Sequence, residues 1–261
     1  MNEKDFEARL AAEPRSVAVR AEYVQYLYQN GQFTACLEQI QRALADFPKH
    51  GQDPLLVQLV KLEEHIVAKQ LRAVVGPIAG LVSTEQPPII DGGRVAELVV
   101  RPTSADLDSL AKGLTSKKLA ELEVLGVMAE SDADAILQCL AQAQLPALFE
   151  MNLWLSGPMS SAALALLARS PLAAQLEVFY LRGDVLQDAD VAALASGFGK
   201  LAELRLRSHE RRGLSERAAS ILCEARGMRG LNTLGILGSA VGDRGALVIA
   251  TSGSLTGLRR L

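Results

Sequence analysis

Aromatic residues are scarce in this sequence: Phe, Trp and Tyr make up only 4% of the 261 residues, and there is a single tryptophan. A core of ordinary size must therefore be built mainly from Leu, Ala, Val and Ile, which favours regular, shallow packing layers. With 49% hydrophobic and 22% charged residues, the balance is that of a globular chain with one large domain or two ordinary ones.

An excess of positive charge is also lacking. The formal net charge is −3, which argues against bulk attraction to nucleic acid or to anionic lipid, because such binding depends on clustered Lys and Arg. The one basic cluster is "RLRSHERRG", residues 205–213. It is expected to be a solvated loop, with half of an anionic or acidic-protein contact as the alternative. We expect neither nucleic acid nor a membrane as the partner.

Cysteine is limited to Cys36, Cys139 and Cys223, an odd and widely spaced set without a C-x-x-C motif. This is poor material for a disulfide framework or a zinc site, and we expect three buried structural thiols. The N-terminus has charges where an export signal needs an apolar run, and the apolar stretch at residues 73–82 is far short of the roughly 20 residues that span a bilayer. We expect a cytoplasmic protein.

Helices are predicted in the first third of the chain. Apolar residues recur at steps of three and four on both sides of "QNGQ", residues 29–32, which predicts two amphipathic helices joined by a tight turn. The second helix ends before Pro48. A longer helix is predicted from Asp53 to Val75, with Asp53 as its N-cap. Residues 1–75 are assigned to a helical module and residues 76–94 to a connector.

This helical part resembles two known families. "GQFTACLEQIQRALADFP" looks like the second half of a tetratricopeptide repeat, with Gly31 at the turn, Cys36 at a helix crossing and Pro48 at the end. "LAAEPRSVAVRAEYVQYLYQNGQ" is similar to the short helical repeat-companion domain that precedes repeat arrays in some bacterial proteins, and residues 74–100 resemble the connector that follows it. The resemblance implies no activity, only an accompanying array of repeats.

From Val95 onward, the pattern apolar-x-x-apolar-x-apolar returns six times. The copies "VAELVV", "LAELEV", "LFEMNL", "LEVFYL", "LAELRL" and "LNTLGI" start at residues 95, 119, 148, 176, 201 and 231. Helix-like stretches separate them, each beginning at or near Ser, Asp or Gly, which cap helix N-termini. The alternation predicts an α/β fold over residues 95–261: a short solenoid of about six to seven units with a parallel sheet inside and helices outside.

These long units resemble the ribonuclease-inhibitor type of leucine-rich repeat, and "LNTLGILGSAVGDRGALVIA" is the most similar copy. The family's asparagine or cysteine after the strand is replaced, so irregular curvature is expected; the replacing residues are Val127, Ser156, Asp184, His209 and Ser239. "LTGLRRL" is predicted to start a further strand at Leu255 with no capping unit after it. Either a homodimer forms through this last repeat, or the C-terminus is cut short.

A candidate binding surface follows from the strand pattern. Side chains alternate between the faces of a strand, so the third, fifth and seventh residues of each unit point to the concave side. The third position is mainly acidic, with Glu97, Glu121, Glu150 and Glu203. The predicted partner-binding residues are Trp154, Tyr180, Arg182, Arg205, Arg207, Leu125, Asn152 and Glu150. Trp, Tyr and Arg carry much of the energy in protein interfaces. The alternative is that Trp154 packs under a neighbouring loop and the arginines pair with Glu150 and Glu203 across strands.

No catalytic or metal-binding motif is recognisable. Asp184, Asp188 and Asp190 lack the spacing and the glutamate of an EF-hand, and they are predicted to be turn and helix-capping residues. The histidines are scattered, and there is no H-E-x-x-H motif and no nucleophile elbow. We expect no cofactor, no metal and no enzymatic activity.

The favoured hypothesis is a non-enzymatic scaffold that binds a protein partner on the concave face. The alternative is an inhibitor or immunity-type protein that masks a toxin or a nuclease, as the leucine-rich-repeat resemblance allows. An enzyme of unrecognised type is the least favoured alternative.

Overall fold

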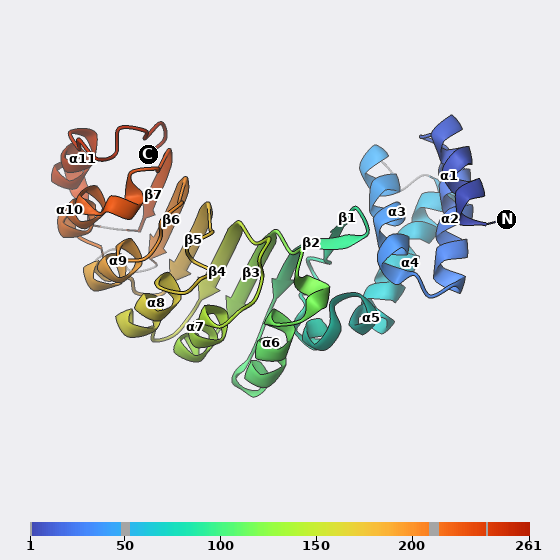
Figure 1. Cartoon of the computed structure of the whole chain (residues 1–261), viewed down its shortest axis with the longest axis horizontal. Coiled ribbons are helices and arrows are strands. Elements are labelled where there is room, and N and C mark those ends of the chain that lie inside the picture. Colours follow the sequence, from blue (N-terminus) through green and yellow to red (C-terminus); the bar gives the residue numbers. More distant parts are fainter. Residues whose placement is uncertain (1, 48–52, 209–213, 239) are drawn as a thin grey trace.

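The computed structural model describes residues 2–47, 53–208, 214–238 and 240–261. Within these ranges the chain forms an α/β fold with eleven α-helices and one seven-stranded sheet. The strand order follows the chain from β1 to β7; β1 is antiparallel to β2, and β2 to β7 are parallel to one another. The sheet is curved, and helices α6 to α11 lie along its outer side (Figure 1).

In the described residues, five α-helices precede the sheet: α1 (Glu3–Ala12), α2 (Val17–Gln29), α3 (Phe33–Asp46), α4 (Pro54–Lys69) and α5 (Leu71–Val75). The two helices around Gly31 are confirmed, and Gly31 adopts a φ of +70°, which favours glycine. Asp53 caps α4 as predicted, because its side chain accepts a hydrogen bond from the backbone N–H of Leu55 at 2.8 Å. The single helix expected over residues 53–75 is wrong, since the chain leaves helical geometry at Gln70. Pro48 lies outside the described residues.

The expected connector, residues 76–94, contains a 3₁₀ helix (Gly76–Leu81) and part of a β-hairpin. The hairpin consists of β1 (Ile89–Asp91) and β2 (Arg94–Val100), and α3 holds it in place. The Gln41 side chain donates to the carbonyl of Pro88 at 2.8 Å and accepts from the N–H of Ile90 at 2.9 Å. The buried Glu38 carboxylate accepts from the N–H of Gly93 at 2.6 Å. The first helices and the sheet therefore meet through specific hydrogen bonds and share a continuous core.

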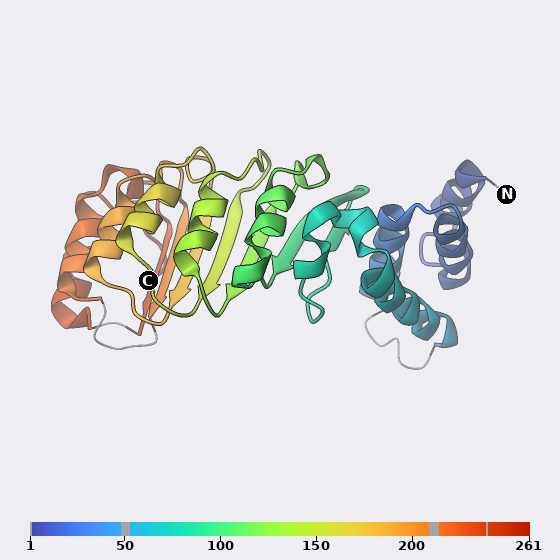
Figure 2. The ribbon, with the colours of Figure 1, turned by 90° about the horizontal axis from the view of Figure 1, so that it is seen from below.

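Strands and helices alternate through the rest of the chain, with each helix on the same side of the sheet (Figure 2). The prediction of a helix-like stretch after each copy of the strand pattern is confirmed. The elements are α6 (Leu107–Leu114), β3 (Val124–Ala129), α7 (Ala133–Ala141), β4 (Glu150–Leu155), α8 (Ser161–Ala168), β5 (Val178–Gly183), α9 (Asp188–Ala195), β6 (Glu203–Ser208), α10 (Glu216–Glu224), β7 (Thr233–Leu237) and α11 (Gly242–Ala250). None of the helices in the described ranges combines the length and the hydrophobicity needed to cross a bilayer.

The core between the sheet and its helices contains the inward residues of each strand. Leu176, Phe179 and Leu181 are fully buried, as predicted for the unit at β5. The Phe179 ring contacts the Phe198 ring with centroids 4.8 Å apart. Because alternate strand residues are buried and half-buried, the opposite set of side chains lies on the inner side of the sheet.

The predicted frame of the second repeat is wrong. Leu125 was expected on the concave face, but it pairs in register with the buried Met151 and is itself fully buried. The sequence "LAELEVLGV" contains two overlapping copies of the pattern, one starting at Leu119 and one at Leu122. The strand uses the second copy. A shift of three residues is odd and therefore exchanges the two faces of the strand.

Leu119, at which the predicted repeat began, has a structural role in the turn before β3. Leu119 ends a 3₁₀ helix (Lys117–Leu119), and the N–H of Leu122 donates to its carbonyl at 3.1 Å, which forms a turn before β3. The same turn joins Leu255 and Leu258, so the unit predicted to start at Leu255 starts at residue 258, and its Arg260 bridges to β7. Buried apolar residues stand at the same place before other strands; they include Leu145, Phe198 and Met228.

The cysteines are only partly as predicted. All three are free thiols, but Cys139 and Cys223 are half-buried, and only Cys36 is buried. Burial raises the pKa of the Cys36 thiol to about 12, so this group stays protonated at neutral pH.

Candidate binding surface

The inner side of the sheet carries three rows of side chains, and no described helix lies over the strands β3 to β7 on that side (Figure 1). The strand register fixes the rows. The first row contains Glu97, Val124, Glu150, Val178, Glu203 and Thr233. The second contains Val99, Gly126, Asn152, Tyr180, Arg205 and Gly235. The third contains Met128, Trp154, Arg182, Arg207 and Leu237, with Arg101 just after β2.

Two aromatic side chains meet at the centre of this surface. The rings of Trp154 on β4 and Tyr180 on β5 form a T-shaped contact, with centroids 5.7 Å apart and an interplanar angle of 64°. On its other side the indole leans across β3, because a Cβ atom added to Gly126 would lie 3.1 Å from Cζ3 of Trp154. Both aromatic residues are half-buried. The Trp154 side chain thus packs against neighbouring strands of the sheet.

The arginines lie beside this aromatic pair. Arg182 is directly in register with Trp154 on one side and with Arg207 on the other. Arg205 and Arg207 are exposed, and Arg182 is half-buried. Strands about 4.8 Å apart bring these side chains into one patch. We call the patch of Trp154, Tyr180, Arg182, Arg205 and Arg207 the aromatic–arginine patch.

Two acidic side chains of the first row, Glu150 and Glu203, are bonded to polar side chains of their own strands. Glu203 accepts from Nε of Arg205 at 2.5 Å, and Glu150 accepts from the Asn152 amide at 2.7 Å. Arg205 therefore forms an ion pair with a glutamate of its own strand, β6. The alternative prediction expected ion pairs between arginines and glutamates of neighbouring strands.

A hollow of about 600 Å³ extends the patch beyond the carboxyl ends of the strands. Trp154, Met128 and Arg182 line it, together with Arg101, which pairs with Glu85 at 2.6 Å. Met128 takes the place that Leu125 had in the predicted surface. This hollow was not foreseen, because its lining depends on the register of the second repeat.

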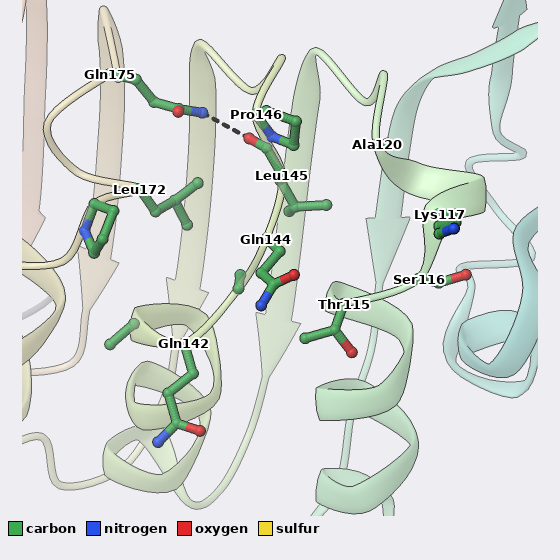
Figure 3. A pocket seen from close by; sticks show the side chains of 13 residues that line it. Thr115, Ser116, Lys117, Ala120, Gln142, Gln144, Leu145, Pro146, Leu172 and Gln175 are labelled. Carbon is green, nitrogen blue, oxygen red and sulfur yellow. Dashed lines mark hydrogen bonds between the residues drawn. The ribbon is translucent and has the colours of Figure 1, made fainter.

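A second hollow, of about 570 Å³, is formed by loops at the opposite ends of the strands (Figure 3). The Gln175 amide donates to the carbonyls of Leu145 and Leu148 at 2.6 and 2.8 Å. These two hydrogen bonds hold the loop before β4 in place. Lys117 is the one charged residue that lines this hollow.

The three aspartates at residues 184–190 connect neighbouring repeats. Asp190 is buried. Its carboxylate accepts a hydrogen bond from the N–H of Gln187 at 2.8 Å, and this bond caps the start of α9 as predicted. The donors from adjacent repeats are the Gly157 N–H for Asp184 (2.7 Å), the Ser215 N–H for Asp188 (2.9 Å) and the Ser161 hydroxyl for Asp190 (2.6 Å). Across residues 2–47, 53–208, 214–238 and 240–261, no three His, Cys, Asp or Glu side chains gather as metal ligands would.

The basic cluster at residues 205–213 falls only partly within the described residues. Arg205 and Arg207 belong to β6, whereas residues 209–213 lie outside the described residues. His209 and Ser239, two of the residues that replace the repeat family's asparagine, also lie outside them.

Comparison with known proteins finds no matching family model, no matching curated protein and no matching solved structure. The resemblances to leucine-rich repeats and to tetratricopeptide-like helices therefore stay predictions.

Proposed function

We propose that this protein is a non-enzymatic scaffold that binds a protein partner on the inner face of its curved sheet. The aromatic–arginine patch carries this proposal, since no described helix covers it. Trp, Tyr and Arg are enriched among the residues that dominate binding energy, because they combine large contact area with directed hydrogen bonds. Here they lie side by side on rigid strands, which lowers the entropy cost of binding.

The finer architecture is part of the proposal. We infer that residues 95–261 form a short leucine-rich-repeat solenoid and that the preceding helices are a tetratricopeptide-like module. The support is the sequential order of parallel strands, the helix after each strand, and the recurrence of buried leucines at matching register positions. Such repeats bury their apolar faces against one another and leave a concave surface for partners.

Quantitative crosslinking capture tests the proposal. The bait is the purified chain, and the comparison is between wild type and the double variant Trp154→Ala with Arg207→Ala. A control variant, Leu166→Ala, removes an exposed apolar side chain from α8 on the outer side of the sheet. We expect at least one protein that wild type and the control capture equally and that the double variant loses by at least about tenfold.

The melting temperatures of the three proteins must be compared, so that loss of folding is distinguished from loss of binding. A partner captured equally by folded wild type and by the folded double variant would place the binding surface elsewhere.

A further inference from the structure

A separate groove lies where the first helices meet the sheet. We call it the junction groove and define it by Leu44 of α3, Glu63 of α4, Pro87, and Ile89, Glu97 and Val99 of the hairpin. Its volume is about 490 Å³. Residues from three parts of the chain far apart in sequence form it, and the hydrogen bonds of Gln41 fix their arrangement.

The groove has an apolar wall that is open to solvent. Ile89 is 46% exposed although it lies in a strand, and Val99 and Leu44 are half-buried. Exposed aliphatic side chains around a concavity favour contact with an apolar part of another molecule.

The charge in the groove is negative and is not balanced within the described residues. No described Lys or Arg forms an ion pair with Glu63 or Glu97, and the nearby Arg94 pairs with Glu121 and Glu123 at 3.3 and 2.9 Å. The Gln41 side chain is already engaged within the protein, because its amide group forms hydrogen bonds with Glu63, Pro88 and Ile90.

The electrostatic environment of Glu97 supports the same conclusion. Glu97 is exposed, but partial desolvation, followed by the nearby carboxylates of Glu150 and Glu123, raises the pKa of its carboxyl group above the ordinary value. A positive charge brought into the groove would relieve this unfavourable environment.

We propose that the junction groove binds a basic, apolar segment of a partner protein, in which a Lys or Arg lies next to an aliphatic side chain. The aliphatic stem of the cation would pack against Ile89 and Val99, while its charged head reaches Glu97 and Glu63. This groove is distinct from the aromatic–arginine patch, because its sheet residues are on β1 and β2, whereas the patch begins on β4.

A fluorescein-labelled short peptide in which Lys and Leu alternate is the probe, and its affinity is measured by fluorescence anisotropy. We expect Glu97→Lys to weaken binding by at least about tenfold, since it replaces an attraction by a repulsion. Ile89→Ser should also weaken it. The matched control is Glu224→Lys on α10, an exposed position with the same change of charge, which should alter the affinity less than about twofold.

Several outcomes would overturn the proposal. The first is that the Lys–Leu peptide does not bind, or that a peptide with Glu in place of Lys binds as well. The second is that Glu224→Lys weakens binding as much as Glu97→Lys, which would indicate attraction to net charge alone. If Trp154→Ala abolishes binding and Glu97→Lys does not, the peptide occupies the aromatic–arginine patch, so the groove proposal fails while the proposed function stands.

Discussion

Truncation of two residues of β3 that lie on opposite faces of the strand should destabilise the protein to very different degrees. Leu125 is 0% exposed and lies in register between the buried Leu98 on β2 and the buried Met151 on β4. Leu125→Ala leaves a cavity that cannot collapse easily, because the backbone hydrogen bonds of both neighbouring strands hold the walls apart. Core Leu→Ala substitutions cost about 2–5 kcal/mol. For a chain of this size, that lowers the melting temperature by roughly 10 °C.

Met128 is the comparison. It lies on the inner face and is only half-buried, so Met128→Ala should cost less than about 1 kcal/mol, or about 3 °C. Thermal unfolding followed by far-ultraviolet circular dichroism, with urea unfolding as a second measure, gives both values. If Met128→Ala proves as costly as Leu125→Ala, the register of the second repeat is wrong, and the rows of the inner face are wrong with it.

Three further substitutions test other parts of the structure. Asp190→Ala should lower the free energy of unfolding by about 1–3 kcal/mol in urea titrations, because the Ser161 hydroxyl and the N–H of Gln187 lose a buried acceptor; an unchanged midpoint would contradict the link between repeats. Gly227→Ala should destabilise by about 1–3 kcal/mol or more by thermal melting, since its new Cβ would lie 1.9 Å from the Phe198 carbonyl oxygen; a neutral effect would show that this close approach is absent. Glu97→Gln should raise stability at neutral pH, because the raised pKa means that ionisation of Glu97 opposes folding. Its advantage should grow as pH rises through the raised pKa of Glu97 and vanish below the ordinary glutamate range, and melting curves across pH that show the reverse trend would refute this sign. The charged groups around it are Glu63, Arg94, Glu123 and Glu150.

The regular part of the fold could be predicted because each repeat contains its own local signals for a strand and a helix. Leucines at fixed spacing mark the strands, and residues such as Ser160 and Ser215 mark helix starts by capping them. Leu176, Phe179 and Leu181 gave the correct inward face without any structure, since a single frame fits that unit.

Prediction failed where one sequence satisfies two frames. Leu119 and Leu122 each begin a match to the repeat pattern, and the strand pairing follows the match that begins at Leu122. Periodicity alone contains no such information. The same ambiguity led to a predicted start of the final unit at Leu255, whereas in the structure this unit starts at Leu258.

The junction groove could not be predicted for a different reason. Gln41 and the hairpin are separated by more than 40 residues, and their hydrogen bonds are long-range contacts that leave no local pattern. By contrast, the position of Trp154 beside Tyr180 and Arg182 followed from strand alternation, because parallel pairing of equivalent positions brings them together.

The central claim is that a protein partner contacts the inner face at Trp154. Because Trp154 is the single tryptophan of the chain, protein grown with 5-fluorotryptophan carries one fluorine reporter on that face. Addition of an unlabelled captured partner should shift its ¹⁹F resonance, with the same concentration dependence as binding measured by calorimetry. Binding in the calorimeter with no change in the ¹⁹F chemical shift would contradict the claim.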